Sequence, residues 1–433
     1  MGETLRLGDF CSKIGSGATP RGGKDSYLEI GPFALIRSQN VYNHGFERTG
    51  LAYISENQAN ALSNVEVQTG DVLLNITGDS VARACQVTDD VLPARVNQHV
   101  AIIRPDGQNV DARFLRYYLV SPTMQAEMLA LASAGATRPA LTKGMIENFR
   151  IPAFSIQKQR AIAGVLSALD DKIELNRRTG ATLEAMARAI FRDWFVDFGP
   201  TRAKMQGREP YLAPDLWPLF PASLDDQGIP EGWEMGTLGD VADTNAASWT
   251  ARSHPDEVEY VDLSKTKWGT IESTAKLPWE KAPSRARRIA RAGDTIIGTT
   301  RPGNGSFAYI SRDGLTVSTG FAVLTPKRPE FRDFVYIAAT DPENIRRLAN
   351  LADGHGGAYP AVRPAEVSDT PVVIPPDEVI DAFAKAVSPL RARIEFNKTE
   401  NETLAQTRDL LLPRLMSGEI RVAEAEKIVE GEV

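Results

Sequence analysis

Apolar side chains recur every seven positions along residues 156–198. Two interleaved series carry this repeat, and they are Ile162, Leu169, Asn176, Leu183 and Ile190, and Leu166, Ile173, Gly180, Ala187 and Trp194. A heptad repeat sustained over several heptads is typical of the seam along which the helices of a coiled coil pack. The pattern therefore predicts one continuous helix that, at about 1.5 Å per residue, is about 60 Å long.

The same apolar stripe returns later in the chain, with an asparagine at the same step. Adding 221 to each number (383 − 162 = 221) gives Phe383, Leu390, Asn397, Leu404 and Leu411, and Val387, Ile394, Asn401, Arg408 and Leu415. A single stripe of this kind is also typical of an amphipathic helix on a globular core. Two stripes at one offset favour two long helices that pack on each other.

The segments that precede the two helices are duplicated as well. Residues 70–74 and 293–297 each contain a Gly-Asp pair before an apolar run, and residues 96–105 match residues 317–326. In each Gly-Asp pair we expect a turn in which Gly takes a positive φ and Asp bonds the local backbone. Since 317 − 96 is again 221, the chain is an internal duplication of one β-rich domain followed by one long helix.

The predicted fold class is therefore α+β, with two β-rich domains separated by a pair of long antiparallel coiled-coil helices in a pseudo-two-fold internal repeat. The second helix is expected to run antiparallel to the first because the first delivers the chain to the second domain. Six prolines between Gly199 and Trp233 break helices and predict an extended linker. The predicted boundaries are 1–155 (first domain), 156–198 (first helix), 199–230 (linker), 231–376 (second domain), 377–418 (second helix) and 419–433 (acidic tail).

One polar residue stands near the middle of each predicted helix. Asn176 and Asn397 occupy the same step of the two series. A polar side chain in a helix seam lowers stability but fixes register and orientation. We therefore predict that Asn176 and Asn397 set the register of the helix pair.

The charge distribution favours a nucleic-acid partner, although the net charge is −7. Two basic segments, residues 135–160 and 281–301, lie one in each repeat. The two cysteines and four scattered histidines provide neither a disulfide framework nor metal-ligand spacing. Without an apolar run of membrane-spanning length or a signal segment, a cytoplasmic protein without membrane contacts is expected.

The sequence lacks the common motifs of catalysis. It contains no Gly-x-x-x-x-Gly-Lys phosphate loop, no Gly-x-Gly-x-x-Gly between a strand and a helix, and no Gly-x-Ser-x-Gly. The Asn-Pro-Pro-Tyr and Asp-Pro-Pro-Tyr tetrapeptides that adenine methyltransferases carry are absent as well. No catalytic or metal-binding residue is therefore predicted, and a DNA-processing enzyme with an unrecognised site is a distant alternative.

Five motifs lie along the chain in a set order. They are Leu-Leu-Asn-Ile-Thr-Gly at 73–78, Asn-Gln-His-Val-Ala at 97–101, Leu-Asp-Asp-Lys-Ile-Glu-Leu-Asn at 169–176, Ile-Phe-Arg-Asp-Trp-Phe-Val-Asp-Phe at 190–198 and Arg-Asp-Leu-Leu-Leu-Pro-Arg-Leu-Met-Ser-Gly-Glu at 408–419. Together they resemble the DNA-specificity subunits of type I restriction-modification systems. The resemblance covers nearly the whole chain, although no Pro-x-Gly-Trp segment precedes Leu5 as Pro230-Glu231-Gly232-Trp233 precedes the second domain.

The resemblance implies that the β-rich domains are target-recognition domains, each of which reads one half of a bipartite, asymmetric sequence in double-stranded DNA. It implies that the paired helices set the spacing between the half-sites. The implied partners are two DNA adenine methyltransferase subunits and two restriction (translocase) subunits. S-adenosylmethionine is expected in the methyltransferase partners, with no cofactor in this chain. The recognition subunit of another multisubunit, type IIB-like restriction system is the alternative.

Candidate DNA-binding residues follow from residue chemistry, since Arg pairs with guanine, Asn or Gln with adenine edges, and Lys with phosphates. For each of them a solvated surface residue is the alternative. The phosphate candidates are Arg138, Lys143, Arg285, Arg287, Arg288 and Arg363. The base candidates are Arg21, Lys24, Arg37, Gln39, Asn40, Tyr42, Lys267, Arg301, Asn304 and Tyr359.

Three aromatic residues near the end of the first helix are candidate anchors for a methyltransferase subunit. These are Trp194, Phe195 and Phe198. Large aromatic side chains often carry much of the binding energy of a protein interface. The alternative is that they are core residues.

Overall fold

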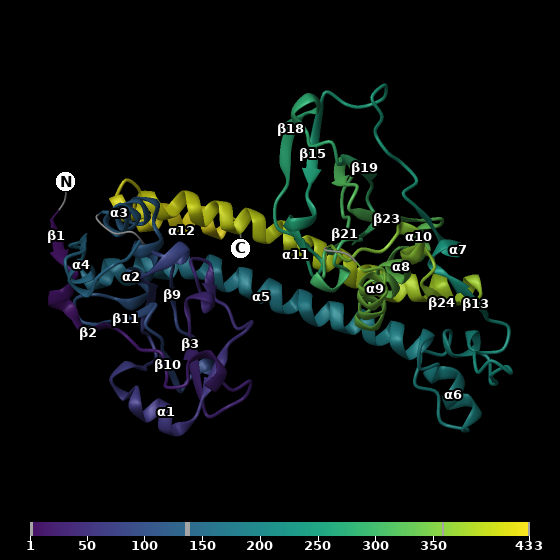
Figure 1. The fold of residues 1–433 in the computed structure, drawn as a ribbon, viewed down its shortest axis with the longest axis horizontal. Coiled ribbons are helices and arrows are strands. Elements are labelled where there is room, and N and C mark those ends of the chain that lie inside the picture. The colour runs from purple at the N-terminus through teal and green to yellow at the C-terminus, as the bar shows by residue number, and fades with distance from the viewer. Residues whose placement is uncertain (1–2, 135–138, 357–358, 432–433) are drawn as a thin grey trace. The chain divides into compact units, whose positions relative to one another are not determined.

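The computed structural model describes residues 3–134, 139–356 and 359–431 and divides into two compact units (Figure 1). Unit 1 comprises Met1–Asn176 and Thr399–Val433, and unit 2 comprises Arg177–Lys398. Two long helices, α5 (Ile156–Phe195) and α11 (Asp377–Ser417), each contribute residues to both units. Helices and sheets are both well represented, so the fold class is α+β as predicted.

The β-rich part of unit 1 contains two four-stranded sheets. In the first sheet every neighbouring pair is antiparallel, whereas in the second sheet β3 and β10 are parallel. The first sheet has the order β2 (Cys11–Ser16), β11 (Val100–Pro105), β8 (Val72–Asn75), β9 (Ala84–Gln86). The second has the order β6 (Ala52–Ile54), β3 (Phe33–Ile36), β10 (Ala94–Val96), β7 (Glu66–Val67).

Short pairs and helices complete unit 1. The two-stranded pairs are β1 (Thr4–Arg6) with β12 (Arg150–Pro152), and β4 (Val41–Tyr42) with β5 (Gly45–Phe46). The helices are α1 (Glu56–Ala61), α2 (Ala112–Val120), α3 (Pro122–Ser133) and α4 (Lys143–Glu147).

Unit 2 repeats this topology. Its first sheet has the order β14 (Ala242–Thr244), β23 (Phe321–Pro326), β20 (Thr295–Gly298), β21 (Phe307–Tyr309). Its second has the order β18 (Ala275–Pro278), β15 (Glu257–Val261), β22 (Leu315–Ser318), β19 (Ala286–Ala290), and β15 is parallel to β22 as β3 is to β10. The sequence duplication is therefore also a duplication of topology.

The remaining elements of unit 2 also have counterparts in unit 1. The two-stranded pairs are β13 (Glu234–Thr237) with β24 (Pro371–Ile374), and β16 (Thr266–Lys267) with β17 (Thr270–Ile271). The helices are α7 (Leu238–Val241), α8 (Arg332–Ala339), α9 (Pro342–Gly354) and α10 (Pro364–Ser368).

The central strands β8 and β20 each contribute side chains to two separate hydrophobic clusters. In β8, Leu73 packs in one hydrophobic cluster while Val72 and Leu74 pack in another, because side chains alternate between the two faces of a strand. The same alternation places Ile296 and Ile297 of β20 in different clusters. These strands are apolar on both faces because both faces are covered.

The Gly-Asp turns form as the sequence predicts. Gly70 and Gly293 have φ values of 86° and 97°. Asp71 accepts a hydrogen bond from the backbone N–H of Gln68 at 2.8 Å, and Asp294 accepts one from Arg291 at 2.8 Å. Both carboxylates are buried, so each turn fixes the start of a central strand.

Within unit 1, α5 and α11 pack antiparallel. Asp170 of α5 contacts Arg408 of α11 at 2.8 Å, and Asn176 donates to the Asn401 side chain at 3.0 Å. Numbers rise along α5 as they fall along α11, which is the antiparallel order. The buried seam includes Ile162, Leu166, Leu169, Ile173, Leu404, Leu411 and Leu415.

Unit 2 contains an antiparallel pair of its own, formed by later residues of α5 and earlier residues of α11. Glu184 contacts Arg391 at 2.8 Å, and Trp194 packs against Phe383 with ring centroids 6.0 Å apart. Asn176 belongs to unit 1, where Asn401 and Glu400 accept its hydrogen bonds, and Asn397 belongs to unit 2. That Asn176 and Asn397 together set the register stays a prediction.

The predicted extended linker is instead folded. Residues 199–230 contain α6 (Gly199–Met205) and a 3-10 turn at Trp217–Leu219, and Phe220 and Ile229 are buried in the core of unit 2. The prediction of an extended linker is therefore corrected. Proline is tolerated in the first turn of a helix, as Pro200 is in α6.

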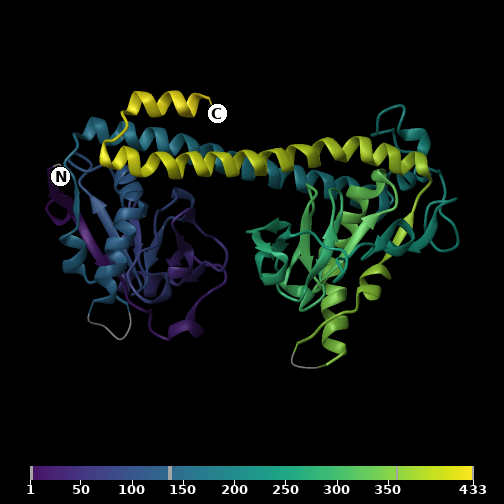
Figure 2. The same ribbon diagram turned by 90° about the horizontal axis from the view of Figure 1, so that it is seen from above.

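The acidic tail, 419–433, contains α12 (Val422–Glu430), which packs on the helix pair of unit 1 (Figure 2). Its buried residues are Ala425 and Val429. The tail is therefore an amphipathic helix, whose charged residues cover only its outer face.

Replacement of Arg391 should destabilise unit 2. The Arg391 side chain is 5% exposed and lies 3.0 Å from Asp333, which is 4% exposed. Because Arg391→Ala leaves a buried carboxylate without its cation, we expect a loss of about 3–5 kcal/mol in unfolding free energy. Thermal unfolding followed by circular dichroism measures the loss. Exposed Arg393 on the same helix is the control, and equal losses for R391A and R393A would contradict the prediction.

Candidate nucleic-acid interface

The base candidates of the first domain lie in two segments of unit 1. Arg21 and Lys24 are exposed at a turn in which Gly22 and Gly23 have φ values of 94° and 62°. The 3-10 turn η3 (Ser38–Asn40) leads into the hairpin of β4 and β5. Exposed basic side chains on a glycine turn have the reach that contact with a duplex requires.

Asn40 is part of the scaffold of this loop. It is fully buried, its side-chain oxygen accepts from the backbone N–H of Arg37 at 3.1 Å, and its amide donates to the carbonyl of Glu47 at 2.9 Å. Both ends of the side-chain amide thus bond the backbone of this loop. The prediction of Asn40 as a base contact is therefore corrected, because a buried amide cannot reach a base edge.

Arg37, Gln39 and Tyr42 are partly committed to local contacts. Arg37 and Gln39 both donate to the carbonyl of Gly50, at 2.6 and 3.1 Å. The half-buried Tyr42 ring lies under the guanidinium of Arg83, 4.7 Å from the ring centroid. Only Gln39 of the three is exposed.

The base candidates of the second domain gather around the hairpin of β16 and β17 in unit 2. Exposed Lys267 ends β16, and exposed Asn304 lies in the turn η10 (Pro302–Asn304). Arg301 lies over the ring of Tyr359 at 5.3 Å, and Tyr359 is 74% exposed. Segments more than thirty residues apart in the sequence therefore converge through tertiary contacts.

Trp268, which the sequence did not single out, joins these residues. It is 63% exposed at the hairpin tip, and its backbone N–H donates to the carbonyl of Gly305 at 2.7 Å. Trp268 and Arg301 both have a φ of 47°, a left-handed conformation that is uncommon for residues other than glycine and that clusters at functional sites. An aromatic residue between a Lys and a Gly is the signal that could have identified it.

The phosphate candidates differ in exposure and in the local contacts that their side chains make. Lys143 is exposed but lies 3.6 Å from Glu147, and the exposed Arg363 lies 3.2 Å from Glu366. Arg287 is half-buried over the ring of Trp279 at 4.3 Å. Arg138 lies outside the residues that the structure describes.

Arg285 is held by a carboxylate. It contacts Asp262 at 2.7 Å and the Tyr260 hydroxyl at 3.0 Å. Burial would raise the pKa of Asp262, but hydrogen bonds from Arg285 and Ser264 outweigh it and hold that pKa well below its usual range. Asp262 therefore stays ionised and competes with a phosphate for Arg285.

Arg288 is in a different state. Its half-burial lowers the pKa of the guanidinium, and among the described residues its Nε has no hydrogen-bond partner. That Nε is buried, so it cannot itself reach a phosphate. Arg288 as a phosphate contact stays a prediction.

The three aromatic anchor candidates are buried in the core of unit 2. Trp194, Phe195 and Phe198 are 3%, 4% and 8% exposed. Their burial favours the alternative that they are core residues. The long helices instead expose Leu175 (59%) and Phe396 (54%), which occupy the same repeat position since 396 − 175 is 221.

Among the residues that the structure describes, no group of three or more His, Cys, Asp or Glu side chains could hold a metal ion. Within the same part of the chain, no helix combines the length and apolar character needed to cross a membrane.

The contact between Trp268 and Gly305 gives a testable prediction. A Cβ on Gly305, which has a φ of 72°, would lie 2.5 Å from two atoms of the Trp268 indole. Gly305→Ala should therefore displace the indole. It should also strain the backbone, and the left-handed conformation of an alanine costs about 1–2 kcal/mol. The emission that Trp268 contributes, isolated by comparison with Trp268→Phe, should shift. The control is Gly314→Ala, where φ is 89° and a Cβ meets nothing within 4 Å; an unshifted Gly305→Ala spectrum would contradict the packing.

Comparison with known proteins identifies the family. The model of the type I restriction modification DNA specificity domain matches residues 2–185 and 230–406. The chain is 25% identical to the HindI specificity subunit of Haemophilus influenzae, with 89% of this chain and 94% of that protein covered. It is 26% identical to the MjaIX specificity subunit of Methanocaldococcus jannaschii, with 77% and 74% covered.

A solved structure shares the fold. The S subunit of a type I restriction-modification system from M. genitalium superposes with a TM-score of 0.55 at 15% identity, covering 95% of each chain. The family model matches well over half of the chain, and it does so once in each repeat. The chain therefore belongs to the family of DNA specificity subunits of type I restriction-modification systems.

Proposed function

We propose that this chain is a non-catalytic subunit that reads a bipartite, asymmetric DNA sequence, with one half-site for each β-rich domain. The observation that carries the proposal is a shared scaffold with different loop chemistry. The hairpin of β4 and β5 has Asn43-His44 at its tip, whereas the equivalent hairpin of β16 and β17 has Trp268-Gly269. Two identical loops would suit two equal half-sites, so different loops support an asymmetric target.

The exposed side chains supply suitable chemistry for base contact. Arg and Lys donate to guanine, and Asn and Gln bond the adenine edge, in the major groove. In the second domain Lys267, Arg301 and Asn304 are exposed around Trp268. In the first domain Arg21, Lys24 and Gln39 are exposed. Helices α5 and α11 would set the spacing between half-sites about one helical turn, roughly 34 Å, apart.

The exposed apolar residues of the long helices support docking of two equal partners. Leu175 and Phe396 recur once per repeat, at the same repeat position and on the outside of the seam. We propose that each receives one DNA adenine methyltransferase subunit, which would bring S-adenosylmethionine, and that restriction (translocase) subunits join that assembly. Chemistry would then reside in the partners, and the isolated chain would neither methylate nor cut DNA.

The recognition subunit of a type IIB-like system is the second candidate, because a shared architecture serves both. The partners distinguish them. Co-purification of a methyltransferase with a separate translocase supports the type I assignment, whereas one fused methyltransferase-nuclease chain supports the alternative.

Loop substitutions should change one half-site only. In the complex with its methyltransferase, Lys267→Ala and Asn304→Ala should relax base preference in the half-site of the second domain by about 1–3 kcal/mol for each lost base contact. Sequencing of methylated adenines measures both half-sites in one experiment. The half-site of the first domain is the internal control, and equal relaxation of both half-sites would contradict the proposal.

Affinity for DNA should fall steeply with salt, because bound cations displace condensed counterions. Lys143→Ala and Arg363→Ala, which remove two exposed phosphate candidates, should each reduce the slope of log affinity against log salt by about one. Fluorescence anisotropy with a labelled duplex measures the slope. Arg48, which is paired with Asp90 at 2.7 Å, is the matched control, and a slope that changes only in R48A would refute the assignment.

A further inference from the structure

Two residues at the same repeat position of the long helices carry opposite charges. Asp170 lies on α5 and Arg391 lies on α11, and 391 − 170 is 221. Each contacts the equivalent domain helix of its own repeat, α2 or α8, and also the other long helix. Asp170 and Arg391 are therefore equivalent in structure as well as in sequence, although their charges are opposite.

In unit 1 the acidic residue is on α5. The carboxylate of Asp170 accepts from Arg116 of α2 at 2.8 Å, from the Tyr117 hydroxyl at 2.7 Å, and from Arg408 of α11 at 2.8 Å. The side chains of Arg116, Arg408 and Asp170 are only 9%, 18% and 21% exposed. The charges are thus shielded from water, and a replacement by a like charge would be costly.

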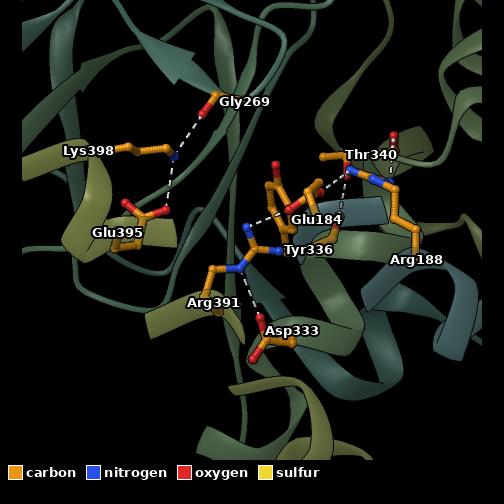
Figure 3. A network of polar contacts seen from close by, with 9 residues as sticks. All are labelled: Glu184, Arg188, Gly269, Asp333, Tyr336, Thr340, Arg391, Glu395 and Lys398. Atoms are coloured by element: carbon orange, nitrogen blue, oxygen red, sulfur yellow. Dashed lines mark hydrogen bonds and ion pairs between the residues drawn. The ribbon is translucent and has the colours of Figure 1, made fainter. Parts of the chain in front are cut away.

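In unit 2 the signs are exchanged (Figure 3). The guanidinium of Arg391 donates to Asp333 of α8 at 3.0 Å and to Glu184 of α5 at 2.8 Å. It also lies over the ring of Tyr336, 4.2 Å from the centroid. Arg188 contacts Glu184 as well, at 2.8 Å. The acid at the helix pair is now Glu184, and the cation occupies the position that corresponds to Asp170.

The duplication creates a competing assembly. Because the two halves share one scaffold, the helix of one half could in principle pair with the same helix of a second copy. In such a pair of N-terminal halves, Asp170 takes the place of Arg391 and faces Glu184. In a pair of C-terminal halves, Arg391 takes the place of Asp170 and faces Arg408. Both like pairs bring two equal charges together in a partly buried seam.

We propose that these crossed charges make the long helices select each other, so that the N-terminal half of a chain accepts a C-terminal half and rejects its own kind. The partner that the seam of each half fits is thus the other half. An apolar seam by itself would tolerate either pairing, since hydrophobic contact is not directional. Selection keeps two unlike β-rich domains on one helix pair, which an asymmetric target requires.

The test uses the full chain, nicked after folding. A protease site inserted at exposed Gly207 separates the halves, and the nicked protein is unfolded in urea, refolded together and analysed by native mass spectrometry. The mixed species contains one N-terminal and one C-terminal half, and a like species contains two copies of the same half. The mixed species should exceed each like species by roughly tenfold or more, because every like-charge contact destabilises the like species. Mixed and like species in statistical proportions would overturn the proposal.

Charge reversals direct the pairing. Glu184→Arg should produce pairs of N-terminal halves, because the introduced guanidinium would face Asp170 of the second copy. Arg408→Glu should produce pairs of C-terminal halves, because the introduced carboxylate would face Arg391 of the second copy. The uncharged E184Q and R408Q should give intermediate amounts. Exposed Arg393, which lies over the Phe396 ring, provides the control R393E. Reversed variants that yield only the mixed species, as R393E should, would overturn the proposal.

A second measurement does not depend on refolding of the halves. In the intact chain, E184R combined with R408E places like charges between α5 and α11 of one copy. The same two substitutions place opposite charges between the two α5 helices, and between the two α11 helices, of a pair of copies. Light scattering should then find twice the mass of the R393E control. An unchanged mass would overturn the proposal.

Discussion

The antiparallel packing of α5 on α11 is the constraint on which both domains depend. Each unit takes one stretch of each helix, although the two stretches are more than two hundred residues apart in the sequence. The hydrophobic cluster that joins the first domain to the helix pair includes Leu404 and Leu411. These two residues lie after the second domain in the sequence. Neither unit is therefore complete until the chain has returned, and such long-range closure carries an entropic cost that the buried seam must offset.

Apolar burial and charge perform different tasks in this seam. Ile162, Leu169 and Leu411 supply contact area that is insensitive to partner identity. The buried charges of Asp170, Arg391 and their partners carry direction, because an unpaired or like-charged ion in such a site is strongly unfavourable. A duplicated scaffold needs this second component, since its two halves present similar apolar surfaces.

The two β-rich domains separate scaffold from variable surface in a similar way. Asn75 donates to the carbonyl of Ser38 at 2.9 Å, and buried Asn40 closes the same loop. These amides hold the backbone of the loop, while the hairpin tips and glycine turns carry the exposed residues. Loop chemistry can therefore differ between domains without loss of the sheets beneath, as the contrast between Asn43 and Trp268 illustrates.

The sequence by itself determined the helix pair, the duplication, the fold class and the family resemblance, because periodicity and repeated motifs are local properties that can be counted along a chain. It did not determine which side chains are exposed and which are buried. Asn40 and Trp194 appeared as candidate contacts and are buried, Trp268 was not selected and is exposed, and residues 199–230 and the acidic tail contain packed helices. Burial depends on which distant segments pack against a residue, as Phe383 packs against Trp194. Only the tertiary structure specifies those neighbours, and with them the reversal of charge between Asp170 and Arg391.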